Sequence, residues 1–277
     1  MTLALKSKAD AFRNMHQAPP MLILPNAWDV VTARLFVKAG ARAIATTSAG
    51  IAATLGYADG QNVPRELMLE AIARIANAVD VPVTADIESG YADSPKELGE
   101  SIRAVINAGA IGVNLEDATG DASQPLFTME QQIERIRAAH KAAENANVPV
   151  VINARTDVYL AKVGEPAGRF AETVRRLTAY REAGADCLFV PGVTDMATLT
   201  QLVQSVVGPI NVLAGSGMPP VADLQRIGIA RLSVGSGIMR ATLALARDAA
   251  DELLQKGTYN TFLDRNISYS EVNELMK

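Results

Sequence analysis

The stretch VPVTADIESGYADSP, residues 81–95, shows how this chain is organised. Its first five residues form the largely apolar run of a buried strand. A Ser-Pro pair with a glutamate at Glu97 then carries the signature of a helix N-terminus: a capping residue, a first-turn proline and the acid of a capping box. Two carboxylates, Asp86 and Glu88, stand where the strand must end. The stretch predicts a β–α unit with acidic side chains at the carboxyl end of its strand.

The same β–α pattern recurs along the chain. Helical periodicity separates the strand-like runs, and Ala-Gly pairs that suit a left-handed helix cap precede several of them. The eight runs fall at residues 21–25, 42–48, 81–86, 111–117, 148–157, 186–192, 210–215 and 230–237. Eight repeats predict a closed (β/α)₈ TIM barrel, with residues 1–277 as a single domain. A doubly wound sheet is the alternative, but it needs no eighth strand.

Two segments depart from a minimal barrel. Residues 49–64 are long for a βα loop, which favours a lid. Residues from about 238 to 277 exceed one closing helix, so we expect a C-terminal helical extension. Its apolar side chains need a partner surface, and exposed apolar surface of this size usually marks an interface. We therefore expect a homo-oligomer, and a tetramer in particular.

Composition narrows the class of protein. The chain has 277 residues, 49% of them hydrophobic, with a net charge of −4 and one cysteine, Cys187. The absence of a basic patch argues against nucleic acid as a partner. A single cysteine gives neither a disulfide framework nor a thiolate metal cluster. No apolar run approaches the ~20 residues of a membrane span, and residues 1–20 lack the core of a signal peptide. We expect a cytoplasmic protein without a membrane partner.

Polar residues alternate with apolar ones along three neighbouring strands. Barrel strands direct alternate side chains to the interior, so the polar set is expected to face the axis and its charges to lie at the carboxyl ends, where barrel active sites form. These polar positions are Thr84, Asp86 and Glu88, then Asn114 and Glu116, then Asn153, Arg155 and Asp157.

Asp86 and Glu116 stand on adjacent strands, ~4.8 Å apart. Two carboxylates that close repel each other unless a cation or proton lies between them. An oxygen-rich set without histidine or cysteine favours Mg²⁺ or Mn²⁺, with Glu88 as a further candidate ligand. Arg155 suits a substrate carboxylate or phosphate. Ser48 and the amides near Gly50 are expected to hold an anion.

Simpler interpretations remain open for each residue. Asp86, Glu116 and Arg155 also suit a structural ion-pair network, and Glu88 suits a solvated loop. Ser48 is equally suited to capping a turn. Other candidates, after the first strand, are Asn26 and Trp28, of which Trp28 also suits packing. No lysine ends a strand, which argues against a Schiff-base aldolase, and the two histidines fall outside the strand ends.

The chain resembles the isocitrate lyase / phosphoenolpyruvate mutase superfamily over most of its length. The resemblance rests on LPNAWDVVTARLFVKAGARAIATTSAG (24–50), TADIESGY (84–91), GVNLED (112–117), NARTD (153–157) and RLSVGSGIMRA (231–241). It implies a (β/α)₈ barrel, Mg²⁺ dependence, helix exchange between subunits, and chemistry at a C–C or C–P bond next to a 2-oxo acid through an enolate.

By the same resemblance, Asp86 and Glu116 match metal-site acids and Arg155 the substrate-binding arginine. Asp59 matches an acid of the loop after the second strand and is assigned a catalytic role with Arg155. The substrate-carboxylate loop is matched by Ser48, Ala49 and Gly50. The lyases of the family carry Cys, His and Lys on the loop after the fourth strand, whereas residues 117–128 contain none of these.

These observations predict a Mg²⁺-dependent lyase-type enzyme acting on a small 2-oxo or 2-hydroxy carboxylate. Decarboxylation of an oxaloacetate-like acid and phosphonopyruvate-type hydrolysis are the variants. Isocitrate and 2-methylisocitrate cleavage are excluded, because the loop residue that would donate a proton is missing. The competing hypothesis is a catalytically silent barrel that binds a metabolite or partner.

Overall fold

The computed structural model describes residues 2–17 and 19–277. All strands pair in parallel within one sheet, in the order β1-β9-β8-β7-β6-β5-β4-β3-β2. The strands are β1 (Leu22–Leu24), β2 (Asn26–Ala27), β3 (Ile44–Thr46), β4 (Val83–Asp86), β5 (Gly112–Glu116), β6 (Val151–Arg155), β7 (Cys187–Val190), β8 (Ile210–Leu213) and β9 (Arg231–Ser233).

The sheet closes because β1 and β2 are two halves of one strand. Pro25 separates them, and proline has no N–H to give to a ladder. The first half pairs with β9 and the second with β3, so the two halves join the ends of the sheet. Each of the eight predicted runs contributes to a strand position, and the predicted (β/α)₈ barrel with a C-terminal helical extension is confirmed.

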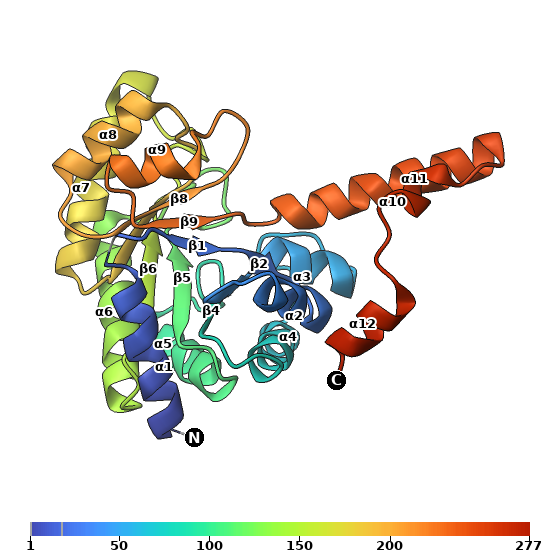
Figure 1. Ribbon diagram of the computed structural model, residues 1–277. Helices are drawn as coiled ribbons and strands as arrows, with labels where there is room; N and C mark the ends of the chain where they lie inside the picture. The colour runs from blue at the N-terminus through green and yellow to red at the C-terminus, as the bar shows by residue number, and fades with distance from the viewer. Residues whose placement is uncertain (1, 18) are drawn as a thin grey trace.

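Helices surround the barrel (Figure 1). They are α1 (Thr2–Met15), α2 (Val30–Lys38), α3 (Ser48–Leu55), α4 (Arg65–Asn77), α5 (Pro95–Asn107), α6 (Met129–Asn145), α7 (Arg169–Glu182), α8 (Met196–Ser205), α9 (Val221–Arg226), α10 (Gly237–Lys256), α11 (Asn260–Leu263) and α12 (Tyr269–Leu275), with a 3₁₀ turn at Pro166–Gly168. Helix α5 starts at the predicted capping box: the Ser94 hydroxyl accepts from Glu97 N at 3.3 Å, and the Glu97 carboxylate accepts from Ser94 N at 3.0 Å.

A layer of buried polar side chains fills the barrel interior below the ends of the strands. Asn153 Nδ2 donates to Asn114 Oδ1 at 2.7 Å, and Arg231 Nη2 donates to the same oxygen at 3.2 Å. Arg231 is fully buried, and burial lowers its pKa to about 10. Cys187 is also buried, and burial raises the pKa of its thiol to about 11, which suits inert core.

Helix α10 leaves the barrel as a projecting arm (Figure 1). Met239 is its one fully buried residue. The chain then returns, and α12 packs on α2, where Arg34 Nη1 donates to the Leu275 carbonyl at 2.8 Å. None of the helices described here is both long and apolar enough to span a bilayer.

Candidate metal and substrate site

The three charged residues predicted for the site do meet at the carboxyl ends of neighbouring strands. Asp86 ends β4, Glu116 ends β5 and Arg155 ends β6. In the sheet register Glu116 lies opposite Arg155, and Asp86 lies opposite Asn114. Because parallel strands present their carboxyl ends at one rim, the three side chains share one mouth of the barrel.

Asp86 is held by donors from the start of α3 and from β5. The backbone N–H and the hydroxyl of Ser48 donate to Oδ2 at 3.1 and 2.9 Å. Asn114 Nδ2 lies 3.5 Å from Oδ1, a long contact that leaves this oxygen weakly engaged. Ser48 thus contacts the carboxylate directly. Asn114 is itself oriented by Asn153 and Arg231, which occupy its carbonyl oxygen.

Arg155 divides its charge between two carboxylates. Its Nη1 lies 2.7 Å from Glu116 Oε2, while Nε and Nη2 lie 2.5 and 2.7 Å from the two oxygens of Asp157. Burial opposes ionisation of Arg155, but the charges of Glu116 and Asp157 outweigh it and raise its pKa. Asp157 takes two of its five N–H groups, on Nε and Nη2, through hydrogen bonds, and Nη1 faces Glu116 as an ion pair, so both terminal nitrogens keep N–H groups without a hydrogen-bond acceptor among the described residues.

Glu116 keeps a raised pKa in spite of its ion pair. Burial is the main cause, and the charges of Asp157, Asp86 and Glu88 add to it, while Arg155 opposes it. One guanidinium shared between two carboxylates cannot compensate both. Of the ion-pair network considered from the sequence, the contact between Arg155 and Glu116 is present and Asp157 joins it, whereas Asp86 lies outside its direct contacts.

Glu88 lies on the loop after β4 and is 5% exposed. Gln61 N donates to Oε2 at 2.6 Å, and the Tyr91 hydroxyl donates to Oε1 at 3.2 Å. Burial, followed by the charges of Asp86 and Asp59, raises its pKa to about 7. Glu88 is therefore buried and hydrogen-bonded, and the solvated-loop interpretation does not describe it.

Asp59 lies on the segment predicted to be a lid. The residue is exposed, but its carboxyl end is partly buried against the site, and this burial together with the charge of Asp86 raises its pKa. Asp59, Asp86, Glu88, Glu116 and Asp157 thus influence one another electrostatically. Among the described residues, Arg155 is the one cationic side chain in ion-pair contact with this group.

The segment expected to hold an anion, residues 48–50, forms the start of α3. Gly50 N donates to the Thr47 hydroxyl at 3.4 Å, which caps the helix. A Cβ at Gly50 would lie 2.6 Å from Thr47 Cγ2 and 2.8 Å from Trp28 Cβ, so close packing requires this glycine. The N–H of Ala49, in the first helical turn, has no acceptor within the described part of the chain.

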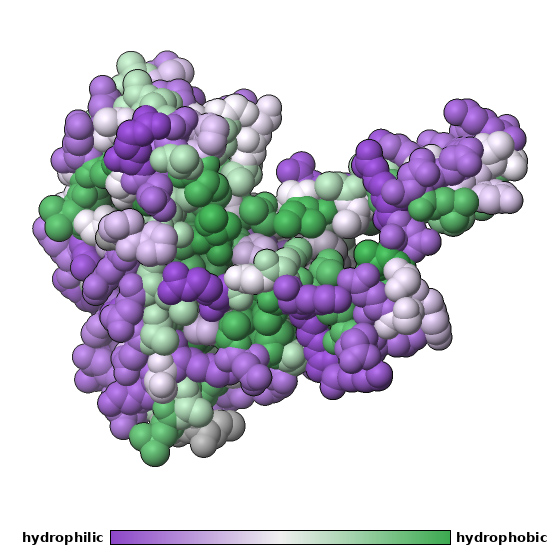
Figure 2. Space-filling view, viewed as in Figure 1, coloured by the Kyte–Doolittle hydropathy of each residue, from purple (hydrophilic) through white to green (hydrophobic). Residues whose placement is uncertain are grey.

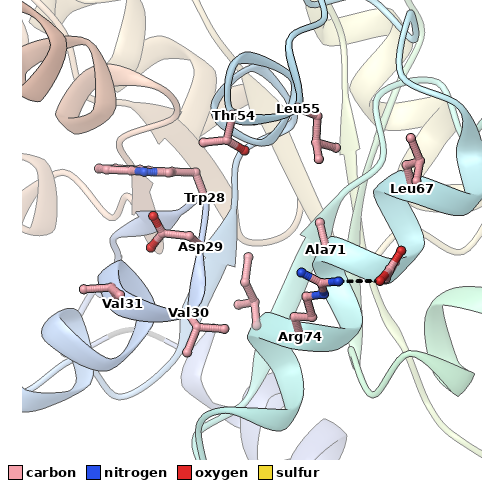
Figure 3. A pocket seen from close by; sticks show the side chains of 11 residues that line it. Trp28, Asp29, Val30, Val31, Thr54, Leu55, Leu67, Ala71 and Arg74 are labelled. Carbon is pink, nitrogen blue, oxygen red and sulfur yellow. Dashed lines mark hydrogen bonds and ion pairs between the residues drawn. The ribbon is translucent and has the colours of Figure 1, made fainter. Parts of the chain in front are cut away.

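Asn26 and Trp28 flank the mouth without entering this cluster of charges. Asn26 Nδ2 donates to the Thr46 carbonyl at 2.8 Å, and Asn26 Oδ1 accepts from Val234 N and Gly235 N, both at 2.9 Å. Trp28 lines a separate groove between α2, α3 and α4 (Figure 3), crossed at its rim by the Arg74–Glu70 ion pair.

The loop after β5 offers no acid for proton donation to a leaving group. Asp121 is exposed, and hydrogen bonds from Ser123 lower its pKa. Asp117 is buried and fully occupied by Thr156, Asp157 N, Tyr180 and Arg176, at 2.7 to 3.1 Å. Asp121 is therefore poorly suited to donate a proton, and Asp117 anchors the backbone beside Arg155.

The donor set fits a hard divalent cation. Within residues 2–17 and 19–277, no three acidic, histidine or cysteine side chains form a ready-made chelate. Mg²⁺ does not need one, because it keeps several waters and is held by one or two carboxylates. The weakly engaged Oδ1 of Asp86, next to carboxyl groups whose pKa values are raised by burial and, after it, by neighbouring charges, suits a cation that neutralises them.

Sequence reasoning missed residues that support the site from behind. Gln61 and Arg135 contact the loop that carries Glu88, and Tyr91, on the same loop, donates to the Glu88 carboxylate. Arg231 donates to the side chain of Asn114. Arg231 alone had a signal, since it stands at a strand position with inward-facing side chains. The other three make contacts that depend on the conformation of the loop after β4, which the periodicity of the sequence does not reveal.

A parallel barrel with acidic side chains and one arginine at its mouth is the architecture of an enzyme of the lyase and mutase class. The chain belongs to the phosphoenolpyruvate phosphomutase family, whose model matches residues 12–254, within the isocitrate lyase / phosphoenolpyruvate mutase superfamily.

Similar proteins support this membership. A solved Burkholderia cenocepacia J2315 protein of inferred lyase or mutase activity is 38% identical with a TM-score of 0.92, over 99% of this chain and 96% of that one. The 2-methylisocitrate lyase of Escherichia coli K12 is 29% identical over 98% of this chain and 94% of its own length. An oxaloacetate decarboxylase of Ectopseudomonas mendocina is 30% identical over 65% and 59%.

Proposed function

We propose that this protein is a Mg²⁺-dependent lyase that breaks a bond next to the carbonyl of a small 2-oxo carboxylate, with an oxaloacetate-like acid decarboxylated as the first candidate reaction. Phosphonopyruvate-type hydrolysis is the nearest variant, and Mn²⁺ is expected to replace Mg²⁺. The observation that carries the proposal is the cluster of largely buried carboxyl groups beside a single arginine whose terminal nitrogens keep N–H groups without an acceptor among the described residues.

Each residue has a role in this proposal. Asp86 holds the metal, with Glu116 and Glu88 completing its surroundings. When bound, Mg²⁺ supplies positive charge that polarises the 2-oxo group. Arg155 binds the substrate carboxylate through its remaining N–H groups, and the free amide of Ala49 adds a donor at the positive end of α3. Ser48 orients Asp86, Gly50 permits the close approach of α3 to Trp28, and Asn26 ties β2 to the loop after β9 beside the mouth.

The missing general acid decides between substrates. A leaving carbanion of succinate type must receive a proton, and loss of a positioned acid typically costs ~10²–10⁴ in rate. Asp59, with its raised pKa, is the remaining candidate for proton transfer at the lid. Loss of carbon dioxide needs no proton on the leaving fragment. We therefore propose that isocitrate and 2-methylisocitrate are not substrates.

Metal binding is the first test. Calorimetric titration with Mg²⁺ in the presence of oxalate should show well over tenfold weaker binding for Asp86→Asn and Glu116→Gln, which is at least ~1.4 kcal/mol. Glu100→Gln, an exposed acid on α5, is the matched control. Unchanged binding in both site variants would leave a catalytically silent barrel as the better account.

We also propose that the chain assembles with copies of itself. A groove of about 520 Å³ runs over β1 between α2 and the start of α10, and Ile23, at its floor, is 47% exposed. Hydrophobic residues gather where α10 leaves the barrel (Figure 2). A barrel normally covers its first strand with the helix after its last strand, and here that helix projects away. Helix α10 of a second copy fits the groove, and a tetramer remains the expected assembly.

A further inference from the structure

The loop after β4 has an unusual backbone. Glu88 and Tyr91 have φ values of +52° and +53°, in the left-handed region that non-glycine residues rarely adopt. Among the described residues, five non-glycine residues have positive φ, and Gln61, which contacts this loop, is a third member of that set. Such a conformation costs on the order of 1–3 kcal/mol per residue and persists only where surrounding contacts enforce it.

Gln61 holds the loop from the lid side. Its side-chain Nε2 donates to the Ser89 hydroxyl, its Oε1 accepts from Tyr91 N, and its backbone N–H donates to the Glu88 carboxylate. Each of these three hydrogen bonds measures 2.6 Å. The backbone amide of Gln61 therefore depends on the position of the Glu88 side chain for its acceptor.

Arg135 holds the loop from the opposite side, out of α6. Its Nη1 donates to the Ala92 carbonyl at 3.0 Å and its Nη2 donates to the Ser89 carbonyl. Its guanidinium lies 4.4 Å from the ring centroid of Phe127, on the loop after β5. Arg135 thus links the two loops that flank the carboxylates.

Burying the charged side chain of Arg135 costs desolvation free energy, which a purely structural contact does not require. The residue is 2% exposed, and no carboxylate of the described residues lies within ion-pair distance of it. A buried guanidinium paired only with carbonyl oxygens retains much of its desolvation penalty. An apolar side chain would fill the same space without that penalty, so the two carbonyl contacts need an explanation of their own.

We propose that Arg135 is a positioning residue for the carboxylate site: by fixing the carbonyls of Ser89 and Ala92, it holds Glu88 in the left-handed backbone in which its buried carboxylate accepts from Gln61 N and the Tyr91 hydroxyl. Gln61 completes the clamp from the lid. The metal-binding consequence rests on the proposed function, whereas the clamp itself does not.

Two substitutions separate this role from packing. Arg135→Lys keeps the charge and most of the buried stem but loses the planar fork that reaches two carbonyls. Arg135→Met removes the charge as well. Arg137→Lys is the matched control on the same helix, because Arg137 is exposed and its side chain pairs with Glu134, at 2.9 Å, on the surface of that helix.

Amide hydrogen exchange read at Gln61 and Tyr91 tests the clamp without metal. We expect at least tenfold faster exchange at both amides in Arg135→Lys, still faster exchange in Arg135→Met, and no change in Arg137→Lys. The melting temperature of Arg135→Lys should stay close to that of the wild type. Unchanged exchange at Gln61 in a folded Arg135→Lys would overturn the proposal, and this variant carries the test if Arg135→Met fails to fold.

Mn²⁺ titration, followed by the electron paramagnetic resonance of the free ion, tests the consequence. Arg135→Lys should bind Mn²⁺ at least fivefold more weakly, with Arg137→Lys unchanged. Faster exchange at Gln61 with unaltered Mn²⁺ affinity would show that the clamp does not serve the metal site, and would overturn the positioning role. A wild-type protein that binds no Mn²⁺ would contradict the proposed function, and the exchange result would then decide the clamp alone.

Discussion

Replacing Glu88 with glutamine should stabilise the metal-free protein while weakening metal binding. Glutamine keeps the size of the side chain and the acceptor for Gln61 N, but removes a charge that is unfavourable because it is buried and because Asp86 and Asp59 repel it. A carboxyl group whose pKa is higher in the folded than in the unfolded state binds more protons in the folded state. Between the two pKa values, the free energy of unfolding therefore falls as the pH rises. The relevant window runs from the ordinary value of 4.5 to about 7.

The size of the effect follows from that window. Raising one carboxyl pKa from 4.5 to about 7 costs about 3 kcal/mol of folding free energy once the group is fully ionised, and less than ~1 kcal/mol at pH 5. For a chain of this length, 3 kcal/mol corresponds to about 5 °C in melting temperature. Glu88→Gln should therefore gain about 3 kcal/mol at pH 8 and little at pH 5.

Urea denaturation at pH 5 and pH 8 in EDTA measures the gain, with Glu100→Gln as the exposed control. Saturating Mg²⁺ should narrow the difference at pH 8, since it stabilises the wild type by binding the folded state. A Glu88→Gln protein that is no more stable than wild type at pH 8 would refute the reasoning that Glu88 is held against repulsion.

Three further predictions concern other parts of the molecule. Arg155→Lys keeps the positive charge but loses the planar guanidinium that binds a carboxylate with two N–H groups. We expect kcat/KM for the substrate to fall at least tenfold while Tm changes little. A large fall in Tm without a kinetic effect would indicate a structural role. Burial lowers the pKa of His16 to about 3, so the wild type should lose about 2 kcal/mol more than His16→Gln as pH falls from 7 to 5; equal slopes in chemical denaturation would contradict this. Light scattering should give a multiple of 29.3 kDa, and a stable monomer at micromolar concentration would exclude the proposed assembly.

The strands and the central charges were predictable from the sequence. Short, nearly continuous apolar runs indicate buried parallel strands. The inward-facing polar residues of β4, β5 and β6 followed from the alternation of side chains along a barrel strand. Because eight β–α repeats predicted a closed barrel, Asp86, Glu116 and Arg155 were expected at the same rim, where the strands end. The break between β1 and β2 could also be predicted from Pro25, because a residue without an N–H cannot donate to the hydrogen-bond ladder of a sheet.

The supporting contacts were not predictable in the same way. Gln61 and Arg135 reach Ser89 across 28 and 46 residues of chain, and both depend on a left-handed turn at Glu88 that no local pattern announces. The use of Asn26 to tie β2 to the loop after β9 likewise depends on barrel closure. Helix α1, which pairs Arg13 with Asp186 on the loop before β7, gave no strand-like or site-like signal.

The most direct test of the proposed function is Mg²⁺-dependent release of pyruvate from oxaloacetate, compared between wild type and Asp86→Asn. Asp86→Asn controls for decarboxylation that free Mg²⁺ promotes in solution. We expect the wild type to form pyruvate at least a hundredfold faster than Asp86→Asn, and to release no glyoxylate from isocitrate. Equal rates for the two proteins across a panel of 2-oxo acids, or robust cleavage of isocitrate, would contradict the account.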